Sequence, residues 1–565
     1  MTDATSDPFV DAEWRVKEGW RLIEEAQKTR RFDAGRISEL FELALTEFRS
    51  RKHTDLEVYR QALVGYALAQ ESLGRYDQAL GAAEELIAAI NRYIGSIRDP
   101  DEQSLVMGEQ RMIIDVAVEC AITLALQERR PNERKHAVTR AWQIVEIQKA
   151  QRTQAAYRRG GLDERTPLLA LKEPSLNDVQ VAMGTLSGGC VLMEFAWFAG
   201  ERLLVFVIEL RTIHLVVLDI RQEDYERWTL AAVGSGENTP DPDTLVFGIA
   251  RMSDELLQPI TIALSRSTDP AWSPPRYVGF IPTGSMNRWP LWTLRSSDSE
   301  TPIGVKHVCF TLASAAMLPL VLERRPHSGS TLSLAPDRRL RFARAQAIAE
   351  ANVYPLGRAL VGREASLSHI QPPFRAVSFA THARLDVSRP QESSVELQAG
   401  HGLRPHSAAE FSRQFTDQQW DLTCLWACST HSGVDTVDDW VGVSSVFLQR
   451  SRSIVATLWP VDDFAATVVA FLFAEQLRDG TPVADALAYA VTTLSSATKQ
   501  TLADIGGRIA SVQGSLWRKY WFLLRCRREL RRMTEYPFGD AVHWAPFFCA
   551  GWPGDLNTPP RRPKD

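Results

Sequence analysis

The chain has 565 residues, of which 45% are hydrophobic and 24% are charged, a composition typical of globular proteins. This length exceeds what one hydrophobic core usually organises, so two or three domains are expected. The formal net charge of −5 gives no electrostatic basis for general nucleic-acid binding.

The seven cysteines are scattered, odd in number and without a CxxC pair, which argues against a disulfide framework or a structural zinc site. The N-terminus is polar and acidic, unlike a signal peptide, and no apolar run approaches the roughly 18 residues of a membrane span. We therefore expect a cytoplasmic protein without a metal, a cofactor or a membrane contact.

Residues from about 9 to 160 show helical periodicity and almost no strand pattern. Around a turn at Gly74, small and apolar residues recur at helical spacing, with Tyr76, Ala79 and Leu80 beginning the second packed face. This unit resembles a tetratricopeptide repeat, so we interpret 1–160 as a helical-repeat domain. A generic helical bundle remains the alternative, because only one unit matches well. Either array would function by binding.

A polar, proline-containing stretch predicts a linker over 161–185. From Cys190 to Ala550, short β-rich runs alternate with helical stretches, which predicts a mainly parallel sheet flanked by helices. The run between Cys190 and Ile220 has the pattern of a meander. We place this domain at 186–556, with halves of about 186–325 and 326–556, followed by a disordered tail at 557–565.

A basic helix is expected within 502–533, and its segment 516–532 mixes aromatic with cationic side chains. One interpretation is a contact with nucleic acid or a membrane. We favour an ordinary amphipathic helix whose aromatic side chains pack inward, and we expect no direct nucleic-acid partner.

Two apolar, strand-like runs end in reactive side chains, Val377-Ser-Phe-Ala-Thr-His382 and Leu422-Thr-Cys-Leu-Trp-Ala-Cys428. In open α/β sheets, catalytic and ligand-binding residues usually lie at the carboxyl ends of such strands. The separation of 428 − 382 = 46 residues leaves room for a crossover that would put both ends on adjacent strands. A nearby imidazole lowers the pKa of a thiol, so the pair suits nucleophilic attack on an amide. Taken singly, each residue has a purely structural alternative.

Several ordered stretches resemble the CHAT family of caspase-like (clan CD) cysteine peptidase domains. They are Trp289-Pro-Leu-Trp292, Phe379-Ala-Thr-His382-Ala383, Leu425-Trp-Ala-Cys428-Ser-Thr430, the run from Ser451 to Asp463, and His543-Trp-Ala-Pro-Phe547. The resemblance implies an α + α/β protein in which the helical array precedes a caspase-like domain. It also implies that Cys428 is the nucleophile and His382 the general acid and base. The main-chain N–H groups of Ala383 and Cys428 would be the oxyanion donors.

Three positions depart from the family pattern. Ala383 stands where glycine is usual, and a Cβ there would be strained if the backbone needed positive φ. Trp426 replaces a small residue and would fill or narrow the substrate pocket. His431 replaces a glycine after Thr430 and is either a second base candidate or an exposed loop residue.

Acidic residues near the expected site favour a substrate with a basic residue before the cut. Asp435 and Asp462 are the pocket candidates, with Asp438, Asp439 and Asp463 in the same segments. The alternative is that each solvates a loop or caps a helix, because Asp462 and Asp463 immediately precede a predicted helix.

These patterns predict a regulated cysteine endopeptidase in which the helical repeats act as a sensor or adaptor. Its partners would be a protein substrate and an activating protein, and the resemblance implies bacterial defence systems such as a CRISPR effector. The alternative function is a catalytically weak scaffold for protein interactions, which the unusual Ala383 and Trp426 would favour.

Overall fold

The computed structural model describes residues 8–29, 31–51, 56–96, 111–159, 174–234, 238–265, 275–295, 301–324, 329–370, 374–384, 393–399, 402–407, 410–411, 414, 419–426, 447–448 and 450–556. The chain forms two compact units, Met1–Gln151 and Arg152–Asp565. Each unit is considered by itself below. Among the described residues, no helix is both long and apolar enough to cross a membrane.

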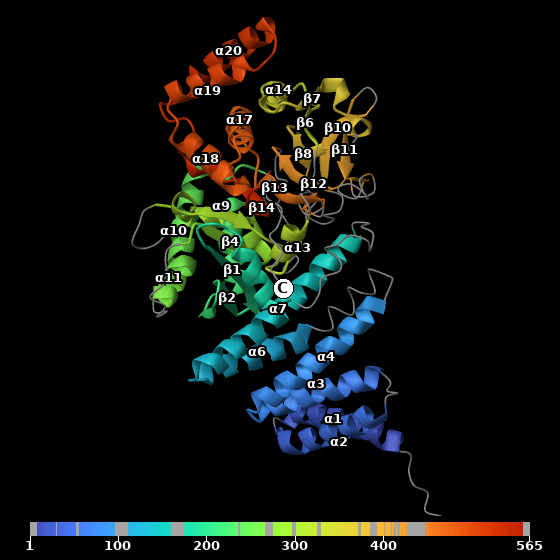
Figure 1. Cartoon of the computed structure of the whole chain (residues 1–565). Coiled ribbons are helices and arrows are strands. Elements are labelled where there is room, and N and C mark those ends of the chain that lie inside the picture. The colour runs from blue at the N-terminus through green and yellow to red at the C-terminus, as the bar shows by residue number, and fades with distance from the viewer. Residues whose placement is uncertain are drawn as a thin grey trace, which may run out of the picture. The chain divides into compact units, whose positions relative to one another are not determined.

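The first unit is an array of helices, coloured blue to cyan in Figure 1. Its helices are α1 (Pro8–Thr29), α2 (Ala34–Arg51), α3 (Leu56–Ser72), α4 (Tyr76–Ser96), α6 (Arg111–Gln127) and α7 (Pro131–Arg159), the last of which continues past the unit's end. From α1 to α6, each helix packs against the next described one. The predicted helical array is therefore confirmed, and its tetratricopeptide character stays a prediction.

Glycines shape this array in two ways. Gly74 adopts a left-handed φ of 70°, and the N–H of Arg75 closes the end of α3 by donating to the carbonyl of Gln70 at 2.9 Å. Gly19 of α1 and Gly65 of α3 flank the buried ring of Phe41, where a Cβ would overlap the ring. These contacts explain the small residues that the sequence places on the packed faces.

The second unit is built on one sheet in the order β3-β2-β1-β4-β5-β14-β13-β12-β8-β6-β7. The strands are β1 (Cys190–Phe198), β2 (Arg202–Ile208), β3 (Ile213–Leu218), β4 (Tyr277–Ile281), β5 (Val308–Thr311), β6 (Ser330–Ala335), β7 (Arg358–Val361), β8 (Phe374–Phe379), β12 (Trp420–Leu425), β13 (Ser451–Thr457) and β14 (Phe547–Gly551). A second, small sheet has the order β11-β10-β9, with β9 (Ala383–Arg384), β10 (Ser394–Ala399) and β11 (Gly402–Ser407).

The large sheet is mainly parallel, as expected. Its antiparallel pairings are the meander β1-β2-β3, which the sequence predicted, and the pair β13 with β14. The neighbouring strands β13, β12, β8 and β6 are parallel throughout, so their carboxyl ends meet at one edge.

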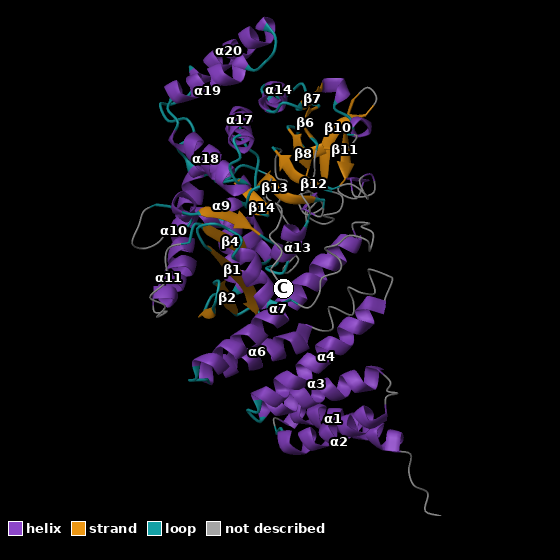
Figure 2. Cartoon of the chain, viewed as in Figure 1, coloured by secondary structure: helices purple, strands orange, loops and turns teal. Residues whose placement is uncertain are grey.

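Helices accompany this sheet, as Figure 2 shows. They are α8 (Leu176–Met183), α9 (Gln222–Val233), α10 (Pro242–Met252), α11 (Gln258–Ser265), α12 (Ile303–Lys306), α13 (Met317–Glu323), α14 (Ala343–Val353), α17 (Asp463–Arg478), α18 (Val483–Ser496), α19 (Lys499–Ser511), α20 (Leu516–Leu530) and α21 (Ala541–Trp544). Short 3-10 or π turns lie at η2 (Ser253–Leu257), η3 (Gly284–Arg288), η4 (Leu291–Thr293), η5 (Gly362–Glu364) and η6 (Leu367–His369). Helix α8 falls inside the stretch predicted as a linker, and 160–173 lie outside the described residues. The proposed domain boundaries stay a prediction.

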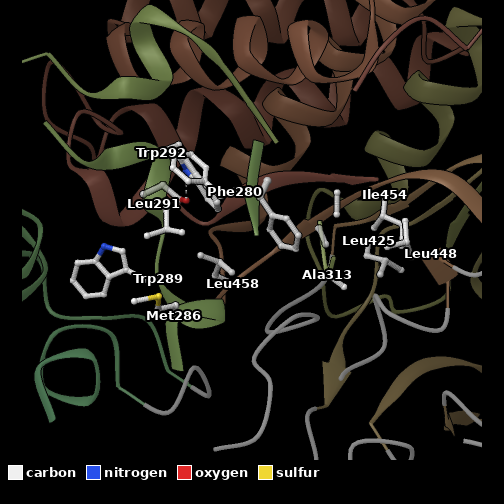
Figure 3. Packing of buried hydrophobic residues seen from close by; sticks show 14 of the residues in the cluster. Phe280, Met286, Trp289, Leu291, Trp292, Ala313, Leu425, Leu448, Ile454 and Leu458 are labelled. Atoms are coloured by element: carbon white, nitrogen blue, oxygen red, sulfur yellow. Dashed lines mark hydrogen bonds between the residues drawn. The ribbon is translucent and has the colours of Figure 1, made fainter. Parts of the chain in front are cut away.

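One hydrophobic core joins the strands of both expected halves of the second unit. Figure 3 shows it running from Met286 and Trp289 past Phe280 to Ile454 and Leu425. The core residues of β8 and β12 therefore share one packed core with strands from a distant part of the chain.

The aromatic side chains of α20 do not all pack inward, so that expectation is wrong for most of them. Trp517, Tyr520 and Trp521 are 69%, 59% and 42% exposed, whereas Phe522 is buried. The inward face is taken by Phe522 and Cys526 at helical spacing, and this turns the earlier aromatics outward.

Candidate active site

Three neighbouring parallel strands, β12, β8 and β6, end level with one another. The ladder continues past the strand ends, because the N–H of Ala380 donates to Leu334 at 2.8 Å and that of Trp426 donates to Phe379 at 3.0 Å. Whatever follows these strands in the chain therefore starts from one fixed edge, with β8 in the middle.

His382 leaves the end of β8 and meets a carboxylate from the end of β6. Its Nε2 lies 3.2 Å from Oδ2 of Asp337. The Asp337 side chain is only 3% exposed, whereas that of His382 is 37% exposed. Asp337 is also held by Arg339, whose main-chain N–H donates to Oδ1 at 2.8 Å and whose Nε donates to Oδ2 at 2.9 Å. A buried carboxylate with a fixed orientation thus contacts an imidazole that is partly exposed to solvent.

Strand β10 clamps both loops that carry this pair. The N–H of Glu396 donates to the carbonyl of His382 at 2.9 Å, and the hydroxyl of Thr381 donates to the carbonyl of Glu396 at 2.7 Å. On the other loop, the Gln398 amide donates to the carbonyl of Pro336 at 3.1 Å. The His382–Asp337 geometry is therefore set by main-chain contacts as well as by the side chains.

Ala383 lies in β9, where it pairs with Val395 of β10. The neighbouring bond from Glu396 to His382 makes this a non-hydrogen-bonded pair, so the N–H of Ala383 points away from β10. Among described non-glycine residues, positive φ is found at Ala199 alone, so Ala383 has ordinary extended geometry. The strain anticipated from replacing glycine does not arise.

Trp426 is buried at the end of β12. It packs edge-on against Phe473 of α17, with ring centroids 5.8 Å apart, and against Phe547 of β14 at 6.2 Å. With 4% exposure, the indole fills the core beneath the sheet edge. Its role in a substrate pocket stays a prediction.

The two aspartates before α17 serve main-chain groups. Asp462 caps the helix by accepting from the N–H groups of Phe464 and Ala465, both at 2.9 Å. Asp463 accepts from the N–H of Phe342 at 2.8 Å, and burial raises the pKa of its carboxyl. The helix-cap interpretation thus accounts for Asp462, and its contribution to specificity stays a prediction.

Cys428, the expected nucleophile, lies outside the described residues, as do Asp435, Asp438, Asp439 and His431. The nearby Cys424 is described, and burial raises the pKa of its thiol well above the usual value. A buried thiol that is kept neutral is a poor nucleophile, so burial disfavours Cys424 as the reactive cysteine.

Asp337 is the site residue that sequence reasoning missed. The signal was available, because the strand ending near Leu334 is followed directly by Ala-Pro-Asp337, a carboxylate at a strand end. Without the strand order, nothing indicated that β6 lies beside β8, and this adjacency is what brings the acid to the histidine.

A comparison with protein-family models matches the CHAT domain over residues 250–552. The chain belongs to the CHAT domain family. The matched region covers β6, β8 and β12 and the positions Asp337, His382 and Cys428, so the CHAT resemblance seen in the separate motifs is confirmed.

No curated protein matches this CHAT chain. Solved structures with similarity include two of the Saccharomyces cerevisiae separase–securin complex, at 3.0 Å and 2.6 Å resolution. Each is 10% identical and covers 96% of this chain, with TM-scores of 0.48 and 0.46. The chain spans 46% of the length of those proteins.

Proposed function

We propose that this protein is a cysteine endopeptidase whose nucleophile is Cys428 and whose base is His382. The observation that carries the proposal is the order of the strands. The strand before Cys428, the strand before His382 and the strand before Asp337 lie side by side, with the histidine strand in the middle. A nucleophile, a base and an orienting acid in this order form the arrangement of a catalytic triad.

The chemistry follows from the ring's orientation. With Nε2 directed to Asp337, Nδ1 is the nitrogen left to accept the proton of the thiol. The thiolate attacks the scissile carbonyl, and the N–H groups of Ala383 and Cys428 stabilise the oxyanion. The protonated His382 then gives its proton to the leaving amine, and water hydrolyses the acyl-enzyme with His382 again as base.

The helical array supplies the regulation in this proposal. An activating protein that binds the array would shift the site toward its active arrangement, and bacterial defence systems are the setting that the family implies. A cytoplasmic, reducing location agrees with the six described cysteines, none of which forms a disulfide.

An electrophilic peptide probe tests the proposal. Peptidyl acyloxymethyl ketones with Arg or Asp at the reactive end are incubated with the chain, and the modified cysteine is found by mass spectrometry. We expect selective labelling of Cys428 and loss of labelling in His382→Ala. In Asp337→Asn, labelling should slow by about 10²- to 10⁴-fold, the range for losing an orienting acid. Faster labelling with Arg would support a basic preference.

Matched controls decide the outcome. Cys424→Ala should label as the wild type does, because that thiol is buried and neutral. Equal, slow labelling of Cys424 and Cys428 that is independent of His382 would refute the peptidase and leave the scaffold alternative. Ala383 no longer favours that alternative, because its backbone is unstrained.

A further inference from the structure

Helix α14 presents a buried acid to the underside of the strands that end at the site. Glu350 is 4% exposed, and the hydroxyl of Ser333 on β6 donates to its Oε2 at 3.1 Å. The amide of Gln346, one turn earlier on α14, donates to Oε1 at 2.9 Å. The candidate mechanism uses none of these groups.

The polar residues near Glu350 form a row across the three site strands. Ser333 of β6 pairs with Ser378 of β8, and Ser378 pairs with Cys424 of β12. Because parallel strands in register point paired side chains to one face, all three face the same side as Glu350. By strand alternation, the next residues on this face are Ala335, Ala380 and Trp426. Asp337 and His382 come two positions further along the sequence.

The row is polar where packing alone would need only small apolar groups. Ser333 and Ser378 are buried, and a buried hydroxyl costs free energy unless it finds a partner. Ser378 Oγ and Trp426 Nε1 make no well-formed hydrogen bond within the described residues, yet both lie close enough to favour the ionised Glu350 electrostatically. One carboxyl thus accepts a hydrogen bond from β6 and lies near Ser378 of β8 and Trp426, which follows β12.

Burial is the larger influence on this carboxyl and raises the pKa of Glu350, although Ser378, Gln346, Ser333 and Trp426 oppose the shift. The titratable groups that face it are Cys424 and Tyr354, and burial raises the pKa of both. Both oxygens of Glu350 already accept a hydrogen bond, one from Ser333 and one from Gln346, so this buried carboxyl is held from β6 and from its own helix.

We propose that Glu350 is a positioning residue that holds β6, β8 and β12 level, and so sets the contact between Asp337 and His382. An effect of Glu350 on catalysis rests on the proposed function, in which Cys428 and His382 form the active site. The physical reason is that Ser333 and Ser378 lie four residues before Asp337 and His382, on the strands that lead to them. A shift of about 1 Å between β6 and β8 would therefore break the 3.2 Å contact between Asp337 and His382. Glu350 itself touches no reacting atom.

The test uses the full chain labelled with ¹⁵N-histidine, in which the His382 signal is assigned by its loss in His382→Ala. Glu350→Leu removes the hydrogen bonds at similar volume, whereas Glu350→Gln keeps hydrogen bonding without charge. Asp337→Asn gives the ring ¹⁵N chemical shifts of His382 without its acid. We expect Glu350→Leu to move the ring ¹⁵N shifts of His382 toward those in Asp337→Asn, and Glu350→Gln to leave them as in the wild type. Alkylation of Cys428 should slow about tenfold or more in Glu350→Leu alone.

A merely structural role predicts another pattern, in which Glu350→Leu lowers the melting temperature but leaves the ring ¹⁵N shifts of His382 unchanged. That result would overturn the proposal. If Glu350→Leu does not fold, Ser333→Ala with Ser378→Ala takes its place, and the same shift or its absence decides. If Cys428 is inert even in the wild type, the peptidase proposal fails, while the ring ¹⁵N shifts of His382 still decide the role of Glu350.

Discussion

In the helical array, the carboxyl of Glu71 should make the stability of the chain depend on pH. Burial raises the pKa of Glu71 on α3 to about 7, and the charge of Glu119 on α6 adds to the shift. Cys120, whose pKa burial raises to about 12, interacts with the same acids. Because the folded pKa of Glu71 lies above its ordinary 4.5, its contribution to stability is complete below about pH 4.5 and is lost as the pH rises through 7.

Glu71→Gln should therefore stabilise the chain at alkaline pH. We expect the variant to melt at a higher temperature than the wild type at pH 8, with a smaller difference at pH 5. Glu119→Gln is the matched control and should give part of the gain, because it removes the second cause and leaves the burial. Equal differences at both pH values would contradict the assignment.

At the scale of elements, α20 shows how one helix divides its aromatic residues. Phe522 packs edge-on against Phe342, which precedes α14, with centroids 6.0 Å apart. Trp517, on the outer face, contacts Tyr520 and Trp521 of its own helix. The packing of α20 against the rest of the unit therefore depends on Phe522 and not on Trp517.

Substitutions on the two faces should then differ in cost. Phe522→Ala should lower the free energy of unfolding by about 3 kcal/mol, as for other buried phenylalanines. Trp517→Ser should change it by less than about 0.5 kcal/mol, as for other exposed positions. Urea denaturation measures both. A loss for Trp517→Ser as large as that for Phe522→Ala would show that the outer face is covered.

The whole molecule contains two compact units. The expected halves of the caspase-like domain share one core, which includes Phe280 and Trp292 from one half and Leu425 and Ile454 from the other. The helical array forms its own unit, Met1–Gln151. Units with separate cores can unfold independently, whereas parts of one core unfold together.

We therefore predict two unfolding transitions for the full chain, which calorimetry can resolve. A core substitution in the array, such as Phe41→Ala, should lower only one of them. Trp292→Ala should lower only the other, and should not split it into two. A single transition that responds to both substitutions would refute the division into units.

Local patterns in the sequence were enough to predict the helical array, the two strands that lead to the site, and the family. Helical periodicity identified the array, continuous apolar runs identified β8 and β12, and ordered motifs identified the CHAT family. His382 was found because a strand that is buried on both faces must end where a polar side chain reaches solvent. Such features depend on near neighbours in the chain, so a single sequence displays them.

Only the tertiary structure decided which distant residues meet. The place of β6 beside β8 gives His382 its acid, and α14 brings Glu350 to Ser333 on the face that β6 and β8 share. The outward aromatics of α20 and the core position of Trp426 also depend on what each face packs against. The order of the strands and the buried face of each helix depend on how much apolar surface the whole chain buries. A short stretch of sequence does not contain that information.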